Sequence, residues 1–587
     1  LPSVSSGGGG RFLGFARADL APIDAARLVR LDWIGLAAFA LPFALALIRL
    51  AAVPARAAAA LLLLGIPTLY GFAPALGLPS TSYYIRGIDP ASMTFPVAIA
   101  GALAFAVIAP RPGERAARAT TILAATLIGV NAVLGVPTYV SPPPDAAIVD
   151  TQSPFAREEL AHLTVPVDGN DLSHRVMPLT ADEAVGFTYR YRTPMLRDYY
   201  DQGQVHPDWI SWAFTSLYDP PLDPPQARAV VEWFAVDRIT VPVTDPDRAR
   251  ALAALDWLRG LPPVGASPYR EFAVLDPATI VGATLAPLAV VIADDGGYDR
   301  ALRLLMSSGA WPRTRLVVHL RGALADLPSD LAATARAVLV VGDRVGDAAR
   351  AANVLRALGS RGAVTIVWDV GDLPAQAIPQ PWPVTALATR DIAAWDVVDR
   401  PGRIGSADFS PARYGDGPWR ATVPNALREG AAADLTLDGA PLIASGAVGN
   451  ATVTVVGGNL FYHALTNANA REAAYLASLL GPATAGAERE PDWSFVDPDT
   501  RVITTDGTPL VIRESFHPNW RATLRTADGS TRDLAIREAG PGVMAVIPQG
   551  TGTVRLEFGP SGAEMFSWAL FAAGIAALVA LARRRLA

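Results

Sequence analysis

The chain has 587 residues, 51% of them hydrophobic, and a formal net charge of −6. No basic block of the kind that binds nucleic acid is present, so we expect no nucleic-acid partner. The chain has no cysteine, which excludes disulfides, thiolate metal sites and cysteine nucleophiles.

Hydrophobic residues are concentrated in five segments of membrane-spanning length. These segments are Leu31–Leu50, Ala57–Ala73, Ala91–Ala109, Ala119–Pro137 and Met565–Ala582. A transmembrane helix needs roughly 20 apolar residues, with about 17 as the lower limit. We therefore predict an external or interfacial segment at 1–30, a four-helix transmembrane region at 31–140, and a final transmembrane helix with a cytoplasmic Arg tail at 564–587. The lipid bilayer is thus an expected partner.

The distribution of arginine predicts the orientation in the membrane. Arg49 and Arg56, the loop Arg111–Arg118 and the tail Arg583–Arg585 fall on one side of a five-span topology, and such residues favour the cytoplasmic side. The polar block 141–563 is then extracytoplasmic. Residues 1–30 would also lie outside despite their arginines, which indicates either a further helix upstream or an external role for them. The chain starts with Leu rather than Met, and we read it as processed or incomplete.

The first part of the polar block, residues 141–285, reads as a mixed α/β module. Helices are expected at Gln226–Ala235 and Pro246–Leu258, and strands at Arg238–Val243 and Glu271–Leu275. The preceding stretch from Tyr189 to Trp212 is rich in Tyr and Trp. Such aromatic side chains either stack on sugars or pack a small core beside the lipid interface, and the sequence leaves both roles open.

Residues 286–485 alternate strand and helix, as a Rossmann-like parallel sheet does. The expected strands are Leu288–Ala293, Arg315–Leu320, Val338–Val341, Ala363–Trp368 and Thr452–Val456. The expected helices are Tyr298–Ser307, Asp330–Ala337, Asp347–Leu358 and Ala470–Leu480. The strands are nearly continuous Val/Ile/Leu runs, which is typical of parallel sheets covered on both faces. A β-rich insertion is expected around residues 402–446.

Residues 486–563 read as a small antiparallel β-sandwich. The expected strands are Arg501–Thr505, Pro509–Glu514, Trp520–Thr526, Arg532–Ile536, Val543–Ile547 and Thr553–Phe558, separated by Gly-containing turns. Trp520 lies on an alternating strand, and we expect it to be buried as a core anchor. The complete fold class predicted is thus a multi-pass α-helical membrane protein with extracytoplasmic α/β and β-sandwich domains.

Polar residues at the carboxyl ends of the predicted parallel strands form the candidate ligand site. Open parallel sheets bind ligands at this edge. The candidate ligand-binding residues are Asp294, Asp295, Asp343, Asp369, Asn459 and His463. The adjacent acids Asp294-Asp295 resemble the paired acids of sugar-nucleotide enzymes. Asp and Asn are also favoured at such positions as turn formers and helix caps, so the two roles stay open.

Several chemistries lack a sequence signature in this chain. The six histidines show no metal-ligand spacing, and there is no phosphate-binding glycine fingerprint, no HExxH motif and no G-x-S-x-G elbow. We predict no metal and no cofactor, and we assign no catalytic residue.

Two parts of the chain resemble known families. The first part lies before the last apolar segment and consists of three stretches, Pro509 to Trp520 (PLVIRESFHPNW), Gly542 to Gly550 (GVMAVIPQG) and Val554 to Phe558 (VRLEF). It resembles the end of YfhO-like bacterial membrane proteins, which belong to the GT-C glycosyltransferase class. Upstream, Tyr199 to Gly203 and Val236 to Pro242 are similar to the external region of that family.

The GT-C resemblance implies a function at the bacterial plasma membrane. It implies that the chain is the C-terminal part of a glycosyltransferase that handles a polyprenyl-linked sugar or glycan on the outer face. The alternative is a non-catalytic scaffold or accessory subunit that binds partner proteins, among them other membrane subunits. The class has about twice as many spans as this chain, and its catalytic acid would lie upstream of Leu1.

The 286–485 region resembles class I glutamine amidotransferase-like domains. Its segment Gly457 to His463 (GGNLFYH) is similar to the segment that closes that fold. The family nucleophile is a Cys after a central strand, and this chain offers Asp369 at the nearest equivalent turn. We therefore expect no amidotransferase activity.

Overall fold

The structure is a computed structural model that describes residues 61, 173–178, 207–219, 221–262, 269–309, 311–482, 486, 488–497 and 500–559. Apart from Leu61, these residues belong to one compact unit, which comprises Pro166–Leu179, Thr193–Leu196 and Val205–Ala587. The five apolar segments and residues 1–30 lie outside the described residues, again apart from Leu61. The predicted location concerns those residues and stays a prediction.

The predicted fold class is wrong. About 40% of the described residues are in strands and 24% in helices, and the strands form four sheets. None of the described helices has both the length and the apolarity that a membrane crossing requires. We took the class from apolar segments outside the described residues, whereas the polar block between them folds into mixed and antiparallel sheets.

A small α/β module precedes the largest of the four sheets, a 13-stranded sheet that is called the large sheet below. Its four strands are β1 (Arg175–Met177), β2 (Val236–Pro242), β3 (Leu258–Gly260) and β4 (Tyr269–Val274), in the order β1-β2-β4-β3. Its helices are α9 (Pro207–Tyr218), α10 (Pro224–Trp233) and α11 (Pro246–Ala253). Trp209 and Trp212 of α9 are 6% and 4% exposed, so these two aromatic residues pack a core rather than display rings for sugar stacking.

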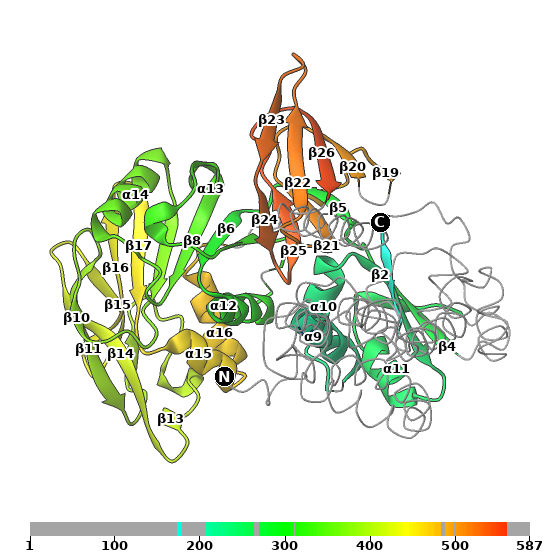
Figure 1. The fold of residues 1–587 in the computed structure, drawn as a ribbon. Coiled ribbons are helices and arrows are strands. Elements are labelled where there is room, and N and C mark those ends of the chain that lie inside the picture. Colours follow the sequence, from blue (N-terminus) through cyan, green and yellow to red (C-terminus); the bar gives the residue numbers. More distant parts are fainter. Residues whose placement is uncertain are drawn as a thin grey trace, which may run out of the picture. The chain divides into compact units, whose positions relative to one another are not determined.

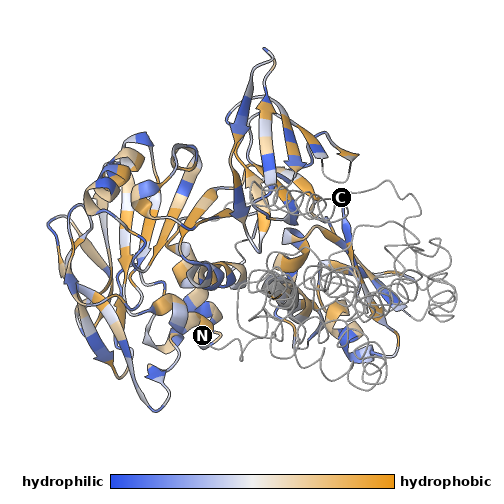
Figure 2. Ribbon diagram, viewed as in Figure 1, coloured by the Kyte–Doolittle hydropathy of each residue, from blue (hydrophilic) through white to orange (hydrophobic). Residues whose placement is uncertain are grey.

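The middle of the large sheet is parallel. The strands of this part are β6 (Leu288–Ile292), β7 (Leu316–Leu320), β8 (Ala335–Val341), β9 (Thr365–Asp369) and β17 (Ala451–Val456), in the order β7-β6-β8-β9-β17. All five match predicted strands closely. The hydropathy colours in Figure 2 show how strongly apolar residues dominate these strands, as expected when neighbouring layers cover both faces.

Three helices connect consecutive parallel strands from β6 to β9, and two more follow β17. They are α12 (Asp295–Ser307), α13 (Ser329–Thr334), α14 (Ala348–Arg361), α15 (Leu460–Thr466) and α16 (Ala470–Ser478), with short 3₁₀ turns at η2 (Leu324–Asp326) and η3 (Ser406–Asp408). The helices α12, α15 and α16 pack on one another, whereas α14 packs with α13, η2 and β17 (Figure 1). The predicted helix at 330–337 is shorter than expected, because Ala335 already begins β8.

The predicted β-rich insertion is present and larger than expected. It contains β10 (Gln376–Ala377), β11 (Val384–Ile392), β12 (Val397–Asp399), β13 (Arg413–Tyr414), β14 (Gly417–Leu427), β15 (Ala432–Leu437) and β16 (Ala440–Val448). The strands β12, β15 and β16 extend the large sheet beyond β17, while β10-β11-β14-β13 forms a separate sheet. Asp438 and Gly439, which join β15 to β16, have φ angles of 49° and 76°, as a tight type I′ hairpin requires.

The C-terminal strands form the predicted β-sandwich and also lengthen the large sheet. The strands β5 (Val281–Thr284), β18 (Glu488–Arg489), β21 (Leu510–Ser515), β24 (Ile536–Ala539) and β25 (Val543–Val546) continue that sheet past β7. A second sheet consists of β19 (Trp493–Asp497), β20 (Thr500–Thr505), β22 (Trp520–Arg525), β23 (Thr531–Leu534) and β26 (Gly552–Phe558). The boundary expected at 485/486 therefore separates strands that belong to one sheet.

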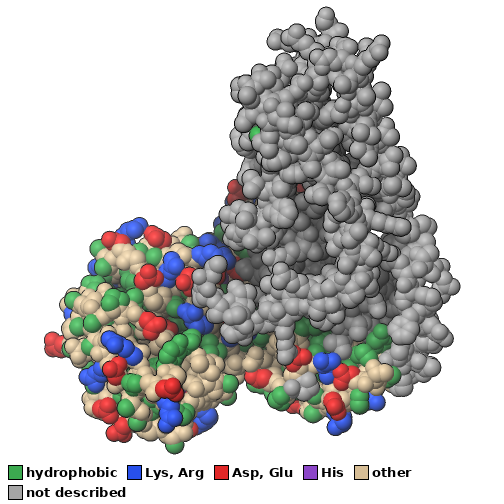
Figure 3. All heavy atoms as spheres, turned by 60° about the horizontal axis from the view of Figure 1, so that its bottom comes forward, with side chains coloured by type: hydrophobic (Ala, Val, Ile, Leu, Met, Phe, Trp, Pro, Cys, Tyr) green, Lys and Arg blue, Asp and Glu red, His purple; other side chains and the backbone are tan. Residues whose placement is uncertain are grey.

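An apolar core lies between the two layers of the sandwich. Ile503, Leu524 and Leu556 of one layer belong to the same buried cluster as Ile512 and Met544 of the other. Trp520 is half-buried and packs against this cluster, so it lies at the margin of the core and is not the fully buried anchor that we expected. Figure 3 shows basic and acidic side chains interspersed over the described surface visible in that view.

Candidate functional site

Asp294 and Asp295 cap and flank the first turn of α12. The Asp294 carboxylate accepts a 2.7 Å hydrogen bond from the backbone N–H of Gly297, and the Asp295 carboxylate accepts one of 2.7 Å from Arg321 Nε. Both acids are exposed. Asp294 therefore acts as a helix cap, and Asp295 as a surface ion-pair partner.

Asp343 follows β8 and points into solvent. Its side chain is 82% exposed, and its Oδ1 lies 3.7 Å from Arg344 Nε. The residue before it, Gly342, has a φ of 61°, so the chain turns away immediately after the strand. This turn matches the role that Asp commonly has in loops.

Asp369 is the last residue of β9 and is buried. Its Oδ1 accepts a hydrogen bond of 3.2 Å from the backbone N–H of Gly371. Burial raises the pKa of Asp369 to about 7, while the Gly371 N–H and the Arg300 charge each lower it by a smaller amount. The carboxyl is not among the groups that line the pocket described below.

Asn459 ends the turn after β17 and faces the site. Its Nδ2 donates a 3.1 Å hydrogen bond to Asp372 Oδ1. The turn is tightly constrained, because a Cβ on Gly457 would lie 2.6 Å from Pro424 Cδ and 2.8 Å from Val423 Cα of β14. Glycine at 457 thus allows β14 to pass directly over the end of the parallel sheet.

His463 is buried beneath the site rather than in it. Its Nδ1 lies 2.7 Å from Glu472 Oε2, and its Nε2 lies 3.3 Å from the backbone oxygen of Pro411. Its ring meets the indole of Trp419 edge-on, with centroids 4.7 Å apart. This histidine supports the aromatic wall described below.

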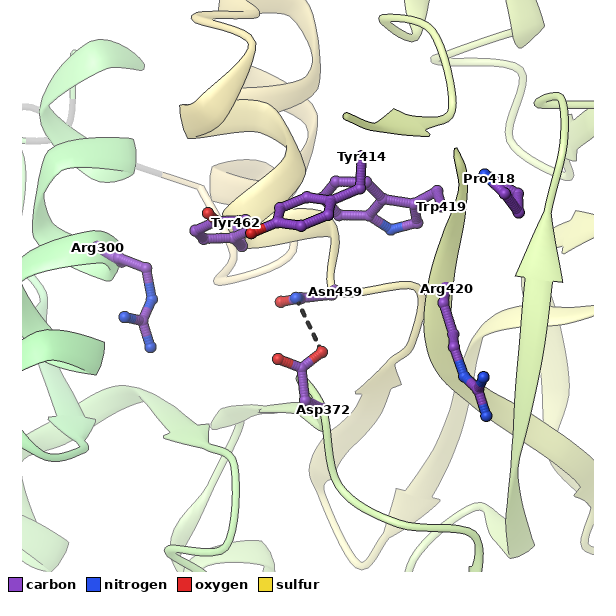
Figure 4. A pocket seen from close by; sticks show the side chains of 8 residues that line it. All are labelled: Arg300, Asp372, Tyr414, Pro418, Trp419, Arg420, Asn459 and Tyr462. Carbon is purple, nitrogen blue, oxygen red and sulfur yellow. Dashed lines mark hydrogen bonds between the residues drawn. The ribbon is translucent and has the colours of Figure 1, made fainter. Parts of the chain in front are cut away.

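A pocket of about 370 Å³ lies where α12, α15, the loop after β9 and the strands β13 and β14 meet (Figure 4). Its lining residues are Arg300, Asp372, Tyr414, Pro418, Trp419, Arg420, Asn459 and Tyr462. Asn459 is thus the one candidate residue among this lining. The volume is within the range of small-molecule sites.

Aromatic rings form one side of the pocket. The rings of Trp419 and Tyr462 are near-parallel, with an interplanar angle of 24° and centroids 6.1 Å apart. Tyr414 stands edge-on to Trp419 at 6.3 Å and is 66% exposed. Trp419 is 3% exposed, and its Nε1 donates a 2.8 Å hydrogen bond to the carbonyl of Gly458. The aromatic wall is therefore anchored at Trp419 and open at Tyr414.

Polar groups form the opposite side of the pocket. In Figure 4, Asp372 and Asn459 lie across from the three rings, and Arg300 and Arg420 stand on either side of this pair. The Nε of Arg420 is 3.9 Å from Asp391 Oδ1, and both side chains are largely exposed. Together, these groups offer both donors and acceptors to a ligand that lies on the rings.

The pocket has the aromatic and polar groups of a binding site, and it has fewer of the groups that a catalytic centre uses. Asp372 is the one carboxylate in the lining. Among the residues that the structure describes, no group of three or more His, Cys, Asp or Glu side chains could hold a metal ion. Asp369, which we had expected at the turn equivalent to that of the amidotransferase cysteine, is buried and does not line the pocket.

Sequence reasoning missed most of the lining. Asp372 lies three residues beyond the candidate Asp369, and Tyr462 is within the Gly457 to His463 segment that we singled out. Their positions in the sequence, close to residues already singled out, could therefore have identified Asp372 and Tyr462 as site residues. Tyr414, Trp419 and Arg420 lie on the insertion strands β13 and β14, and their sequence carries no signal that they return to the edge of the parallel sheet.

No protein-family model and no curated protein matches this chain. Among solved structures, it is similar to an exo-β-1,4-mannosidase, Op5Man5, from an Opitutaceae bacterium, strain TAV5. The identity is 16%, the match covers 34% of this chain and 37% of the mannosidase, and the TM-score is 0.22. It is also similar to the cytoplasmic protein STM3548 from Salmonella typhimurium, with 10% identity, 33% and 98% coverage and a TM-score of 0.21. These scores are too low to transfer a fold or an activity.

Proposed function

We propose that this protein binds carbohydrate, and that the pocket between α12, α15 and β14 holds one sugar unit of a glycan. The observation that carries the proposal is the half-buried ring of Tyr462, supported by the near-parallel, buried indole of Trp419, across from the hydrogen-bonded pair Asp372 and Asn459. A pyranose ring has apolar C–H faces and a rim of hydroxyl groups. Aromatic rings stack on the C–H faces of the sugar, and carboxylate, amide and guanidinium groups form hydrogen bonds with its hydroxyl groups.

The rigidity of the aromatic wall supports this role. Trp419 is held by its hydrogen bond to Gly458 and by the ring of His463 behind it. A wall that is ordered before binding reduces the entropy cost of holding a ligand. Tyr414, exposed at the mouth, is placed to contact a neighbouring sugar unit.

The lining favours binding over hydrolysis. Glycosidases commonly place two carboxyl groups on either side of the scissile bond. Here Asp372 lines the pocket, whereas Asp369 is buried and does not line it. The GT-C resemblance implied that the chain handles glycan, and the proposal keeps the glycan as ligand without assigning a transfer step to any residue.

A glycan-binding screen with the purified full-length chain tests the proposal. The chain is applied to a panel of oligosaccharides, and hits are measured by calorimetry. Tyr462→Ala and Asp372→Asn should weaken binding about tenfold or more, since each removes a principal contact. Asp343→Asn is the matched control, because Asp343 is an exposed acid after the neighbouring strand but does not line the pocket.

Two results would contradict the proposal. The first is a chain that binds no glycan at millimolar concentration but captures a partner protein through this face, which would favour the scaffold alternative. The second is glycan binding that Tyr462→Ala and Asp372→Asn leave unchanged, which would place the sugar site elsewhere.

A further inference from the structure

The pocket carries an excess of positive charge that a neutral sugar does not need. Its lining contains two guanidinium groups, Arg300 and Arg420, and one carboxylate, Asp372. Two positive charges and one negative charge leave a net charge of +1. Asp372 already accepts a hydrogen bond from Asn459, so part of its capacity is used within the protein.

Arg300 has no counter-ion within the described part of the chain. Its closest acids along α12 bond elsewhere, because Asp295 pairs with Arg321 and Asp299 pairs with Arg303. No ion pair or hydrogen bond to the Arg300 guanidinium is found among the described residues. The buried carboxyl of Asp369 lies within electrostatic range of Arg300, but its raised pKa, about 7, leaves it only partly ionised at neutral pH.

Arg420 is held only weakly by the protein. Its distance of 3.9 Å to Asp391 is long, and the two side chains are 75% and 62% exposed. Exposed pairs of this kind contribute little, because water and salt screen them. Both guanidinium groups that flank the Asp372–Asn459 pair are therefore available to a ligand (Figure 4).

We infer that the pocket selects a saccharide carrying an anionic group, with Arg300 as the group that pairs with it. This inference rests on the proposed carbohydrate binding and names the class of sugar. A guanidinium binds carboxylate, sulfate and phosphate oxygens through two parallel N–H···O bonds, which a neutral hydroxyl cannot reproduce. The sugar ring lies on Tyr462, which the buried Trp419 supports, and its charged substituent points toward α12.

Matched pairs of sugars test the inference on the full-length chain. Calorimetry compares each neutral oligosaccharide with its uronate, sulfated and phosphorylated counterparts. We expect at least one anionic form to bind about tenfold more tightly at low salt, and this advantage to shrink at about 0.5 M salt. The three anionic arms identify whether carboxylate, sulfate or phosphate is the group recognised.

Variants of Arg300 separate charge recognition from sugar stacking. Arg300→Gln should remove the preference for the anionic sugar, because the affinity for the anionic form should fall about tenfold more than the affinity for the neutral form. Arg300→Lys should keep part of the preference, because it keeps the charge but not the bidentate geometry. Arg356→Gln is the control, an exposed arginine on α14 whose guanidinium bonds Ala352 and Asn353.

The possible outcomes separate this inference from the function on which it rests. Equal affinity for neutral and anionic sugars, or a preference that survives Arg300→Gln, would overturn the inference and leave carbohydrate binding intact. No binding of any sugar would overturn both. Loss of the preference in Arg300→Gln, with the neutral sugar still bound, would support both.

Discussion

The indole Nε1 of Trp419 donates a 2.8 Å hydrogen bond to the carbonyl oxygen of Gly458. This bond joins β14 of the insertion to the turn that follows β17 of the parallel sheet. A second hydrogen bond joins the same two segments, because the Gly458 N–H donates a 2.7 Å hydrogen bond to the carbonyl oxygen of Thr422 on β14. The aromatic wall of the pocket is thus attached to the sheet whose edge provides Asp372 and Asn459.

Replacing Trp419 by Phe should affect both stability and binding. The variant keeps an aromatic ring but loses the bond to Gly458, so we expect the free energy of unfolding to fall by about 1 kcal/mol. Glycan affinity should fall as well, because the ring is no longer held. Urea unfolding and calorimetry measure the two effects. In the control Trp493→Phe, the bond lost is to the exposed Glu490, and affinity should not change.

The parallel sheet could be predicted from the sequence for a clear physical reason. Strands buried on both faces need mostly apolar residues, so β6 and most of β8 appear as nearly continuous apolar runs, and β17 is rich in Val. The turns of the sandwich could also be predicted from the sequence, because Gly507 and Gly529 have φ angles of 97° and 84°. Positions with positive φ favour glycine.

The site could not be predicted in the same way. Carboxyl ends of parallel strands share an edge, and this placed Asn459 correctly near the pocket. The rule does not say which side chains turn inward, and Asp294 and Asp343 turn out to be a cap and a solvent-exposed turn residue. Trp419 reaches the edge through the long-range pairing of the insertion, which no local pattern encodes.

Glu472 should be a strong determinant of stability. It is 1% exposed, its Oε2 lies 2.7 Å from His463 Nδ1, and its Oε1 accepts 2.7 Å hydrogen bonds from Ser410 N and Asn469 Nδ2. Glu472→Ala leaves several buried donors without an acceptor, so we expect a loss of about 3 kcal/mol or more in the free energy of unfolding.

Chemical denaturation checks the prediction for Glu472. The exposed Glu429 provides the control, and Glu429→Ala should change stability by no more than about 0.5 kcal/mol. If Glu472→Ala unfolds at the same denaturant concentration as the wild type, the buried network is not formed in solution.

Gly457→Ala should distort the pocket from its base. The added methyl would meet Pro424, Val423 and the carbonyl oxygen of Thr422 at 2.6 to 3.0 Å, so β14 must move. Overpacking of this kind typically costs about 1–3 kcal/mol. Denaturant unfolding and glycan affinity should both decline. Gly260→Ala is the control, because a Cβ at Gly260 has no neighbour within 4 Å, and the variant should behave like the wild type.

Asp369 should make the stability of the chain depend on pH. Burial raises the pKa of Asp369 to about 7 in the folded state, whereas an unfolded Asp titrates near 3.9. The folded state therefore holds this proton more tightly than the unfolded state. Protonated Asp369 therefore contributes to the free energy of unfolding. This contribution is fully present below about pH 4, is lost progressively as the pH rises to about 7, and changes no further above that.

Asp369→Asn isolates this effect, because the amide has nearly the same shape and does not ionise. The difference in unfolding free energy between wild type and variant should change by up to about 4 kcal/mol between pH 4 and pH 8, with the variant gaining relative to the wild type as the pH rises. Other titrating groups cancel in this difference. A flat difference curve would show that Asp369 is ionised in the folded state and that water or Arg300 solvates it.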